Sequence, residues 1–359
     1  MPRFYHRLVC GPKPSPRRLD RLDQTVRRYV KTWLHFPNGV PIAFLYTPIP
    51  MGGLGIPSLR TLIPRLRLRR LTKLQRSDHP AIKWALQTTH GQRDFQDSVR
   101  LTYMQGVQLR TKKEENSYWA TRLRRHVDGM PLRWADATKD TAATHRWMRG
   151  MPYLSGKEFV LLTQLRINAL PCRSRLSRGL PNPAVRACRT GCTYPESLDH
   201  VLQMCPAVEL RIIQRHHDAV KRIAAALRKL QLEVLMEDQS TTNGGKRPDL
   251  IVIAEDTLWI LDVQIAGSAH GLDRINATKM DPYKEPGFVE RLPHPELQRK
   301  WSAIIVNYAG TRHPEGSSTL LGLGIPKKEI LNITVNICQG SLRIFRDHQR
   351  LSYSRNRQR

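Results

Sequence analysis

The sequence predicts a multidomain protein of mixed class, helical in its first part and α/β in its last third. Three observations support this prediction. At 359 residues, the chain is longer than one typical hydrophobic core requires. Apolar residues recur at helical spacing up to residue 230, and short β-branched runs replace them from residue 231. A tight group of cysteines with one histidine lies shortly before this change.

Basic residues dominate the charge of the chain. Lysine and arginine outnumber aspartate and glutamate by 59 to 30, which gives a formal net charge of +29 and a pI near 10.6. So large a positive potential favours polyanionic partners, above all DNA or RNA. The alternative is a basic surface that binds nothing. With 40% hydrophobic and 25% charged residues, the chain is expected to fold.

Neither a membrane segment nor a disulfide scaffold is predicted. No apolar run approaches the roughly 18 residues of a spanning helix, and the start, MPRFYHRLVCGPKP, lacks a signal-peptide core. We therefore expect no membrane partner. Six cysteines are too few to staple a chain of this length, which indicates a reducing compartment, cytosol or nucleus.

The N-terminal part is predicted to be helical and basic. Residues 17–34 carry apolar side chains at helical spacing, and a loop rich in proline and glycine follows at residues 38–59. Residues 63–74 resume a basic helix with Pro64 in its first turn. Its arginines surround the helix, so some should meet phosphates, although a solvated face is the alternative. They are Arg65, Arg67, Arg69 and Arg70.

The middle of the chain is polar and favours helices, but its residue pattern indicates no function. Residues 79–155 contain four expected packing anchors, Trp84, Trp119, Trp134 and Trp147. Residues 158–170 are predicted to be helical. The RSRLSRG stretch that begins at Arg173 is expected to be a basic loop.

The cysteine and histidine group has the spacing of a zinc site. The pattern C-x3-C-x7-H-x4-C is formed by Cys188, Cys192, His200 and Cys205. Four soft or borderline ligands at such short spacing can close a tetrahedron around Zn²⁺. Because the protein fills all four positions, a structural role is favoured, and binding would fold this segment. The alternative is a chance grouping of unpaired cysteines.

The last part of the chain reads as a small sheet flanked by helices. A long helix is predicted at residues 209–230, followed by strands at residues 231–236, 249–254, 257–265 and 302–309. A turn, TTNGGK, is predicted at residues 241–246, and a polar helix at 271–280 separates the third and fourth strands. This mixed order predicts an α/β domain.

Two aspartates on neighbouring predicted strands form the candidate active site. Asp249 begins the second strand, and Asp262 lies inside the third, where an unpaired carboxylate is costly. Hard carboxylate oxygens suit Mg²⁺ or Mn²⁺, and phosphodiester hydrolysis needs such an ion. Lys279 follows on the polar segment and would stabilise developing charge. The alternative is one solvent-facing aspartate and one buried aspartate satisfied by hydrogen bonds.

In this order, the motifs resemble the C-terminal half of the protein encoded by site-specific non-LTR retrotransposons that insert into ribosomal RNA genes. PMGGLGIPSLR, at residues 50–60, resembles the thumb that follows the reverse transcriptase palm. LRINALP, at residues 165–171, resembles the family's linker motif, which touches nucleic acid. The zinc knuckle and a restriction-like endonuclease follow. The resemblance covers nearly all of the chain.

The resemblance implies four regions. They are a thumb-like helical region at 1–85, a helical linker at 86–180, a CCHC zinc knuckle at 181–210, and a restriction-endonuclease-like, PD-(D/E)XK, α/β domain at 211–350. Asp249 and Asp262 would be the catalytic metal ligands, Lys279 the catalytic lysine and Tyr283 the aromatic residue beside it. Gln264 stands where a D-x-K signature has lysine, a displacement that this family shares.

The linker motif implies further contacts with nucleic acid. Its expected binding residues are Arg166, Asn168, Arg173 and Arg175, with arginine at position 166 where histidine is common in the family.

The activity implied by the resemblance is nicking of double-stranded DNA in ribosomal RNA genes, after which the exposed 3′-hydroxyl primes reverse transcription of the element RNA. The expected location is the nucleus, in the nucleolus, after cytoplasmic synthesis, and a second copy on the DNA is one further candidate partner. No paired-aspartate polymerase motif is present, so we expect the chain to be part of a longer element protein.

Three rival functions stay open. One is a catalytically inactive nucleic-acid-binding remnant or domesticated copy. Another is a structure-directed resolvase or repair nuclease of the same fold. The third is a zinc-dependent interaction protein.

Overall fold

The structure is a computed structural model that describes residues 3–133, 145–236, 247–268 and 271–357. It forms two compact units, which are described separately below. The first contains residues up to 48 together with 53–123, and the second contains residues 49–52 together with 124–359. The division expected after residue 85 therefore lies inside the first unit. The turn predicted at residues 241–246 lies outside the described residues.

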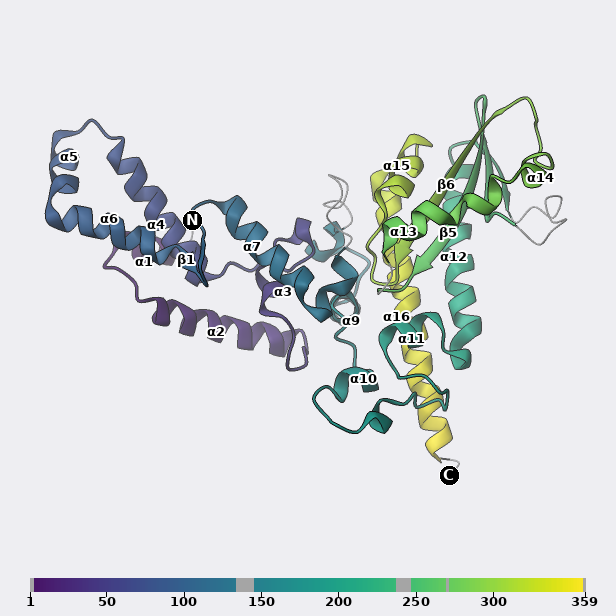
Figure 1. The fold of residues 1–359 in the computed structure, drawn as a ribbon, viewed down its shortest axis with the longest axis horizontal. Coiled ribbons are helices and arrows are strands. Elements are labelled where there is room, and N and C mark those ends of the chain that lie inside the picture. Colours follow the sequence, from purple (N-terminus) through teal and green to yellow (C-terminus); the bar gives the residue numbers. More distant parts are fainter. Residues whose placement is uncertain (1–2, 134–144, 237–246, 269–270, 358–359) are drawn as a thin grey trace. The chain divides into compact units, whose positions relative to one another are not determined.

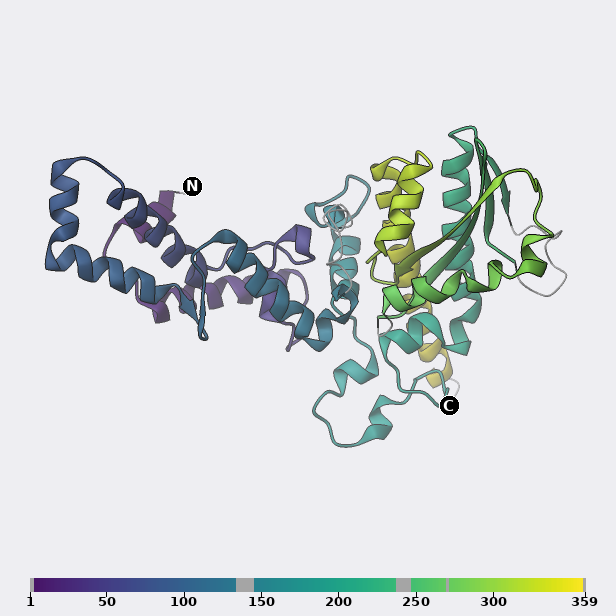
Figure 2. The same cartoon turned by 45° about the horizontal axis from the view of Figure 1, so that its top comes forward.

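The first unit is helical apart from one two-stranded ribbon. In Figure 2, α5 connects α4 to α6 at one end of this unit. Its elements are α1 (Arg3–Cys10), α2 (Pro16–Trp33), α3 (Ile42–Tyr46), α4 (Leu59–Gln75), α5 (Pro80–Gln87), α6 (Thr89–Leu101), β1 (Tyr103–Met104), β2 (Val107–Gln108) and the start of α7 (Lys112–Arg125).

A buried aspartate explains where α4 begins. Asp23 of α2 accepts hydrogen bonds from the backbone N–H of Leu59, at 2.7 Å, and of Arg60, at 3.0 Å. These donors have no partner within their own helix, so an aspartate from a neighbouring helix stabilises this end. The helix starts one turn before the predicted residue 63. Pro64, expected in the first turn, therefore lies inside the helix.

The second unit begins with short helices and continues into an α/β domain (Figure 1). Its helical elements are η1 (Ile49–Met51), η2 (Val127–Leu132), η3 (Arg146–Arg149), α9 (Gly156–Arg166), α10 (Arg173–Leu176), η4 (Pro183–Arg186), α11 (Leu198–Gln203), η5 (Pro206–Val208), α12 (Glu209–Arg228), α13 (Leu272–Lys279), η7 (Asp281–Tyr283), α14 (Pro286–Val289), α15 (Pro314–Gly322) and α16 (Lys327–Arg357). RSRLSRG, expected to be a loop, starts as the short helix α10 because Cys172 and Arg173 carbonyls accept local hydrogen bonds.

The predicted strands are confirmed, and they form one mixed sheet. Its strands are β3 (Glu233–Met236), β4 (Leu250–Ala254), β5 (Thr257–Ala266) and β6 (Gln298–Asn307), in that spatial order. The first three pair in antiparallel fashion, whereas β5 and β6 are parallel. Parallel strands need a crossover connection, and here the chain between them contains α13 and α14.

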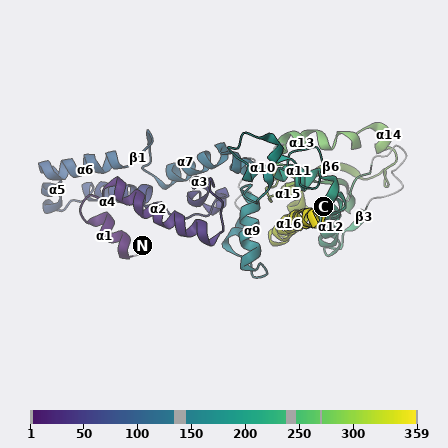
Figure 3. The same cartoon turned by 90° about the horizontal axis from the view of Figure 1, so that it is seen from below.

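Both faces of the sheet are covered, so the domain has three layers. Figure 3 shows α13 and α14 on one side and α12 and α16 on the other. Side chains from α12, α15 and α16 meet one face in a common core, including Ile223, Val263 and Ile333. On the other face, Ile260, Phe288 and Ile305 form a second core. A one-residue slip would exchange the side chains that fill the two cores, so the packing within each core fixes the strand register.

The four tryptophans expected as packing anchors have different outcomes. Trp119 and Trp147 are buried. Trp84 is 71% exposed on α5, so its prediction as an anchor is wrong. Trp134 lies outside the described residues. Within the described part of the chain, no helix has both the length and the apolar character needed to cross a bilayer.

Candidate active site and metal centre

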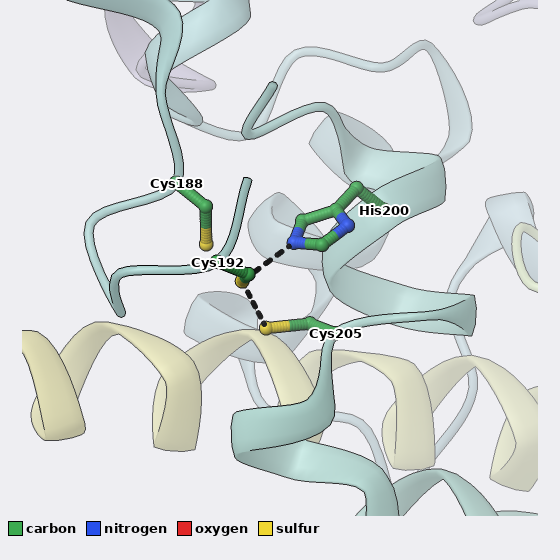
Figure 4. Close-up of side chains that lie close together, drawn as sticks. All are labelled: Cys188, Cys192, His200 and Cys205. Carbon is green, nitrogen blue, oxygen red and sulfur yellow. Dashed lines mark hydrogen bonds between the residues drawn. The ribbon is translucent and has the colours of Figure 1, made fainter. Parts of the chain in front are cut away.

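The predicted zinc ligands come together in the structure. Cys188, Cys192, His200 and Cys205 each place one donor atom within 4.8 Å of the others, and Figure 4 shows their side chains converging. Two cysteines lie on the turn that Gly191 closes with a φ of +87°, a conformation that glycine adopts without strain. His200 lies on α11, and Cys205 follows that helix.

The spacing of the donor atoms fits a tetrahedral ion. Zn–S bonds of about 2.3 Å separate two sulfur ligands by about 3.8 Å. The Cys192 and Cys205 sulfurs are 3.6 Å apart, and Cys192 Sγ lies 3.2 Å from His200 Nε2. Burial raises the pKa of the Cys188 thiol to about 12, which favours the neutral thiol in the metal-free cluster. The expected grouping is confirmed, and its donor set suits zinc.

The sheet brings the two predicted acidic residues together. Asp249 directly precedes β4, and Asp262 lies in β5. Because Leu250 pairs with Leu261 in the antiparallel register, positions 249 and 262 stand opposite each other on one face of the sheet. Val263 donates its backbone N–H to Asp249 Oδ2 at 2.7 Å, which fixes the first carboxylate at the start of its strand.

The second carboxylate is buried among polar partners. Asp262 is 4% exposed, and Lys279 Nζ lies 3.1 Å from its Oδ1. The Tyr283 hydroxyl donates to Asp262 Oδ2 at 2.5 Å and lies 2.9 Å from the carbonyl of Arg247. All four residues that we predicted as catalytic therefore meet in one cluster. Gln264 makes none of these contacts, and the amine in the cluster is that of Lys279 on α13.

Burial and neighbouring charge shift the pKa values of the two carboxylates in opposite directions. Burial, together with the charge of Asp249, raises the pKa of Asp262 to about 6. Burial also raises the pKa of Asp249, but hydrogen bonding and charge from His216 outweigh it and leave that pKa below its ordinary value. Two carboxylates with separated pKa values beside an amine are typical of a functional site.

His216 is not among the candidate site residues predicted from the sequence, but the structure places it beside them. His216 on α12 places its Nε2 3.3 Å from Asp249 Oδ2 and 2.9 Å from the carbonyl of Val263. The hydrogen bond with Asp249 raises the pKa of His216. The one signal for the contact between His216 and Asp249 is the position of His216 on the face of α12 that is directed at the strand ends.

Comparison with known proteins adds independent support. The chain is 32% identical over 372 residues to "Retrovirus-related Pol polyprotein from type-2 retrotransposable element R2DM" of Drosophila melanogaster, a match that covers 98% of this chain and 33% of that protein. It is 28% identical to the Pol polyprotein of a type-1 R2 element of Nasonia vitripennis, over 100% of this chain and 34% of that protein. A Popillia japonica R2 Pol polyprotein is also 28% identical, and the chain covers 69% of it.

The chain is a homologue of the R2 Pol polyproteins. It spans about a third of the length of the first two relatives. No protein-family model matches it.

Two of the arginines expected at phosphates are buried in ion pairs of the first unit. Arg65 Nε lies 2.8 Å from Glu115 Oε2, and Arg67 Nη2 lies 2.7 Å from Asp94 Oδ1. Both side chains already have carboxylate partners, which corrects the expectation that the whole arginine set can reach phosphates. Arg69 and Arg70 are exposed.

The expected linker contacts are also internal for the most part. Arg166 is fully buried, with its guanidinium 5.6 Å from the Trp147 ring centroid, and burial lowers its pKa to about 10. Arg175 is paired with Asp128 at 2.7 Å. These two arginines support the fold of the second unit.

The remaining linker residues are less enclosed. Asn168 adopts a φ of +49°, and its side-chain oxygen accepts from the Tyr308 hydroxyl at 2.8 Å, a structural contact. Arg173 is half-buried, with its Nη1 3.0 Å from the carbonyl of Ala187.

Proposed function

We propose that the chain carries the endonuclease of an R2-type element, a metal-dependent activity that nicks one strand of double-stranded DNA. The observation that carries the proposal is the cluster of Asp249 and Asp262 on one face of the sheet with Lys279 beside them. The mixed sheet with helices on both faces supports a restriction-endonuclease-like domain. The homology supports a role in a retrotransposable element, and we propose that this element moves by target-primed reverse transcription.

Each residue of the cluster has a distinct proposed task. Asp249 and Asp262 would hold Mg²⁺ or Mn²⁺, which when bound offsets phosphate charge and favours ionised water. The Lys279 ammonium stabilises negative charge as the phosphodiester is attacked. The Tyr283 hydroxyl donates to Asp262 Oδ2 and so orients that carboxylate. The zinc knuckle is proposed to be structural, since four protein ligands fill the tetrahedron.

The proposed partners follow from the family resemblance of the sequence motifs and from the charge. The substrate would be double-stranded DNA of ribosomal RNA genes, with element RNA as a second nucleic acid. We propose action in the nucleolus, where those genes lie, and a second copy of the protein as a partner on the DNA. The net charge of +29 supports polyanion binding but does not distinguish DNA from RNA.

A plasmid assay tests the activity. Supercoiled plasmid with or without a ribosomal RNA gene insert is incubated with the chain and Mg²⁺, Ca²⁺ or EDTA. We expect Mg²⁺-dependent conversion to nicked circle. Binding that weakens steeply with salt, without any nicking, would instead support the inactive nucleic-acid-binding remnant. Cleavage confined to branched DNA would support the resolvase alternative.

The raised pKa of Asp262 predicts an acid limit to the activity. Below about pH 6 the folded protein protonates Asp262 and loses charge needed for the cation, so at limiting Mg²⁺ the nicking rate should fall there and recover with excess Mg²⁺. The effect of pH on the stability of the metal-free fold has the opposite direction. An unfolded aspartate ionises near pH 3.9, so this group makes the metal-free fold less stable as pH rises from about 4 to about 6. Nicking rates at two Mg²⁺ concentrations, measured over this range and above it, check the prediction.

Replacement of His216 should weaken metal binding more than turnover. His216→Ala removes the group that holds Asp249, and such supporting partners typically change metal affinity by about 10- to 100-fold. The Mg²⁺ concentration for half-maximal nicking should therefore rise by about tenfold. The measurement is a Mg²⁺ titration, with His217→Ala on the same helix as the matched control. An unchanged titration curve for His216→Ala would exclude this role.

Exposed and buried arginines of α4 should differ in their effects. Replacing both Arg69 and Arg70 by glutamine should reduce the slope of log affinity against log salt by about 0.9 for each phosphate that the variant no longer neutralises. Arg65→Gln leaves Glu115 without its ion-pair partner and should instead lower the free energy of unfolding by about 3 kcal/mol. DNA binding at several salt concentrations and urea unfolding separate the two. Equal salt slopes for all variants would exclude α4 from the interface.

A further inference from the structure

The zinc-ligand cluster has a further neighbour from the end of the chain. His348, on α16, is fully buried, and its Nε2 lies 3.3 Å from the sulfur of Cys188. The two residues are 160 positions apart in sequence. Cys188, Glu196 and His348 also place donor atoms within 4.8 Å of one another, so the first question is whether they form a second metal site.

The surroundings of Glu196 exclude a second metal site. Its carboxylate accepts from the Arg189 side chain at 2.6–3.0 Å, from the Arg189 backbone N–H at 3.0 Å and from the Arg173 backbone N–H at 2.9 Å. These donors saturate the carboxylate, and the guanidinium would repel a second cation. The partner that the geometry leaves for His348 Nε2 is therefore the Cys188 sulfur.

We propose that His348 donates an Nε2–H···S hydrogen bond to the Cys188 thiolate in the zinc-loaded protein and so acts as a positioning residue of the metal centre. A zinc-bound thiolate carries negative charge that an N–H donor stabilises. Neutral imidazole has one N–H. Among the described residues, His348 Nδ1 is buried without a hydrogen-bond partner. The tautomer that carries its proton on Nε2 is therefore favoured, because that N–H has the Cys188 sulfur as acceptor.

This bond would connect the knuckle to the α/β domain. Near His348, Arg189 of the knuckle also donates to Gln349 Oε1 at 2.5 Å. Earlier turns of the same helix contribute Ile330, Ile333 and Ile337 to the core against the sheet. Zinc occupancy would thus hold the C-terminal part of α16 in place. The inference requires zinc at the four-ligand site, but it does not depend on nuclease activity.

The test compares His348→Gln, which keeps an N–H donor, with His348→Leu and His348→Asn, which lose the donor or its reach. The full chain is first shown to hold one zinc ion per molecule. Zinc transfer to a colorimetric chelator is then timed. We expect release about tenfold faster in His348→Leu and His348→Asn, and a rate near wild type in His348→Gln. His313→Leu, at another buried histidine of this unit, is the control and should release zinc at the wild-type rate.

Cobalt substitution gives a second readout that packing alone would not move. The ligand-field bands should keep the tetrahedral three-sulfur, one-nitrogen form in all variants, whereas the thiolate-to-cobalt charge-transfer bands should shift in His348→Leu and His348→Asn. The proposal is overturned if His348→Gln releases zinc as fast as His348→Leu and His348→Asn. It is also overturned if His348→Leu and His348→Asn release zinc at the wild-type rate. A change of the ligand-field bands would also overturn it, because His348 would then be a ligand. If His348→Leu does not fold, His348→Asn supplies the comparison.

Discussion

Replacing Asp262 by asparagine should abolish Mg²⁺-dependent nicking while leaving the protein folded. The substitution keeps the shape of the side chain and removes the charge between Lys279 and the facing Asp249. A neutral amide is a poor ligand for a hard cation, and loss of one group that stabilises the transition state costs about 100- to 1,000-fold in rate. We expect a loss of at least this size, measured as the initial rate of conversion of supercoiled plasmid to nicked circle.

Stability provides the internal control for this prediction. Burial and the neighbouring Asp249 charge raise the pKa of Asp262, so the ionised carboxylate destabilises the metal-free fold at neutral pH. Asp262→Asn should therefore unfold at the same or a higher urea concentration than wild type. Asp281→Asn, at an exposed aspartate just beyond α13, is the matched control and should nick at the normal rate. Wild-type nicking by Asp262→Asn would refute the assignment of the active site.

Local pattern was sufficient to predict the acidic pair. Two β-branched runs separated by a short turn define an antiparallel hairpin, and its period of two places Asp249 and Asp262 on the same face once Leu250 pairs with Leu261. The zinc ligands were predictable for a similar reason, since short spacing within one segment limits where the four donors can lie. The strands and the helix at α12 follow from their periodicity.

Contacts between distant segments were not predictable in this way. Arg65 and Arg175 looked like free cations in sequence, but each meets a carboxylate about 50 residues away, Glu115 and Asp128. A buried arginine with an acidic partner cannot be told from an exposed one by composition. His216 joins the site only because α12 packs on the sheet. Long-range packing therefore decides which charged side chains act on ligands and which stabilise the fold.

Removal of zinc should unfold the knuckle and leave the β-sheet folded. Cys205 is fully buried beside Cys192, so Cys205→Ser deletes one of the four ligands of the knuckle. Binding of a structural zinc contributes on the order of 10 kcal/mol to the folding of such a segment. We expect Cys205→Ser, or wild type treated with a strong chelator, to lose bound zinc and amide-exchange protection over residues 188–205. The core strands β4 and β5 should keep their protection, because they are held by two hydrophobic cores that contain no knuckle ligand.

Cys172→Ser is the matched control for this experiment, because Cys172 is a buried cysteine of the same unit outside the ligand set. It should retain one zinc ion per chain and normal exchange over residues 188–205. If Cys205→Ser kept its zinc and its protection, the cluster would be a chance grouping of thiols. If chelation instead exposed β4 and β5 as fully as the knuckle, zinc would stabilise the entire second unit. The extent of exchange along α16 would then measure how far the metal centre supports the domain that carries Asp249 and Asp262.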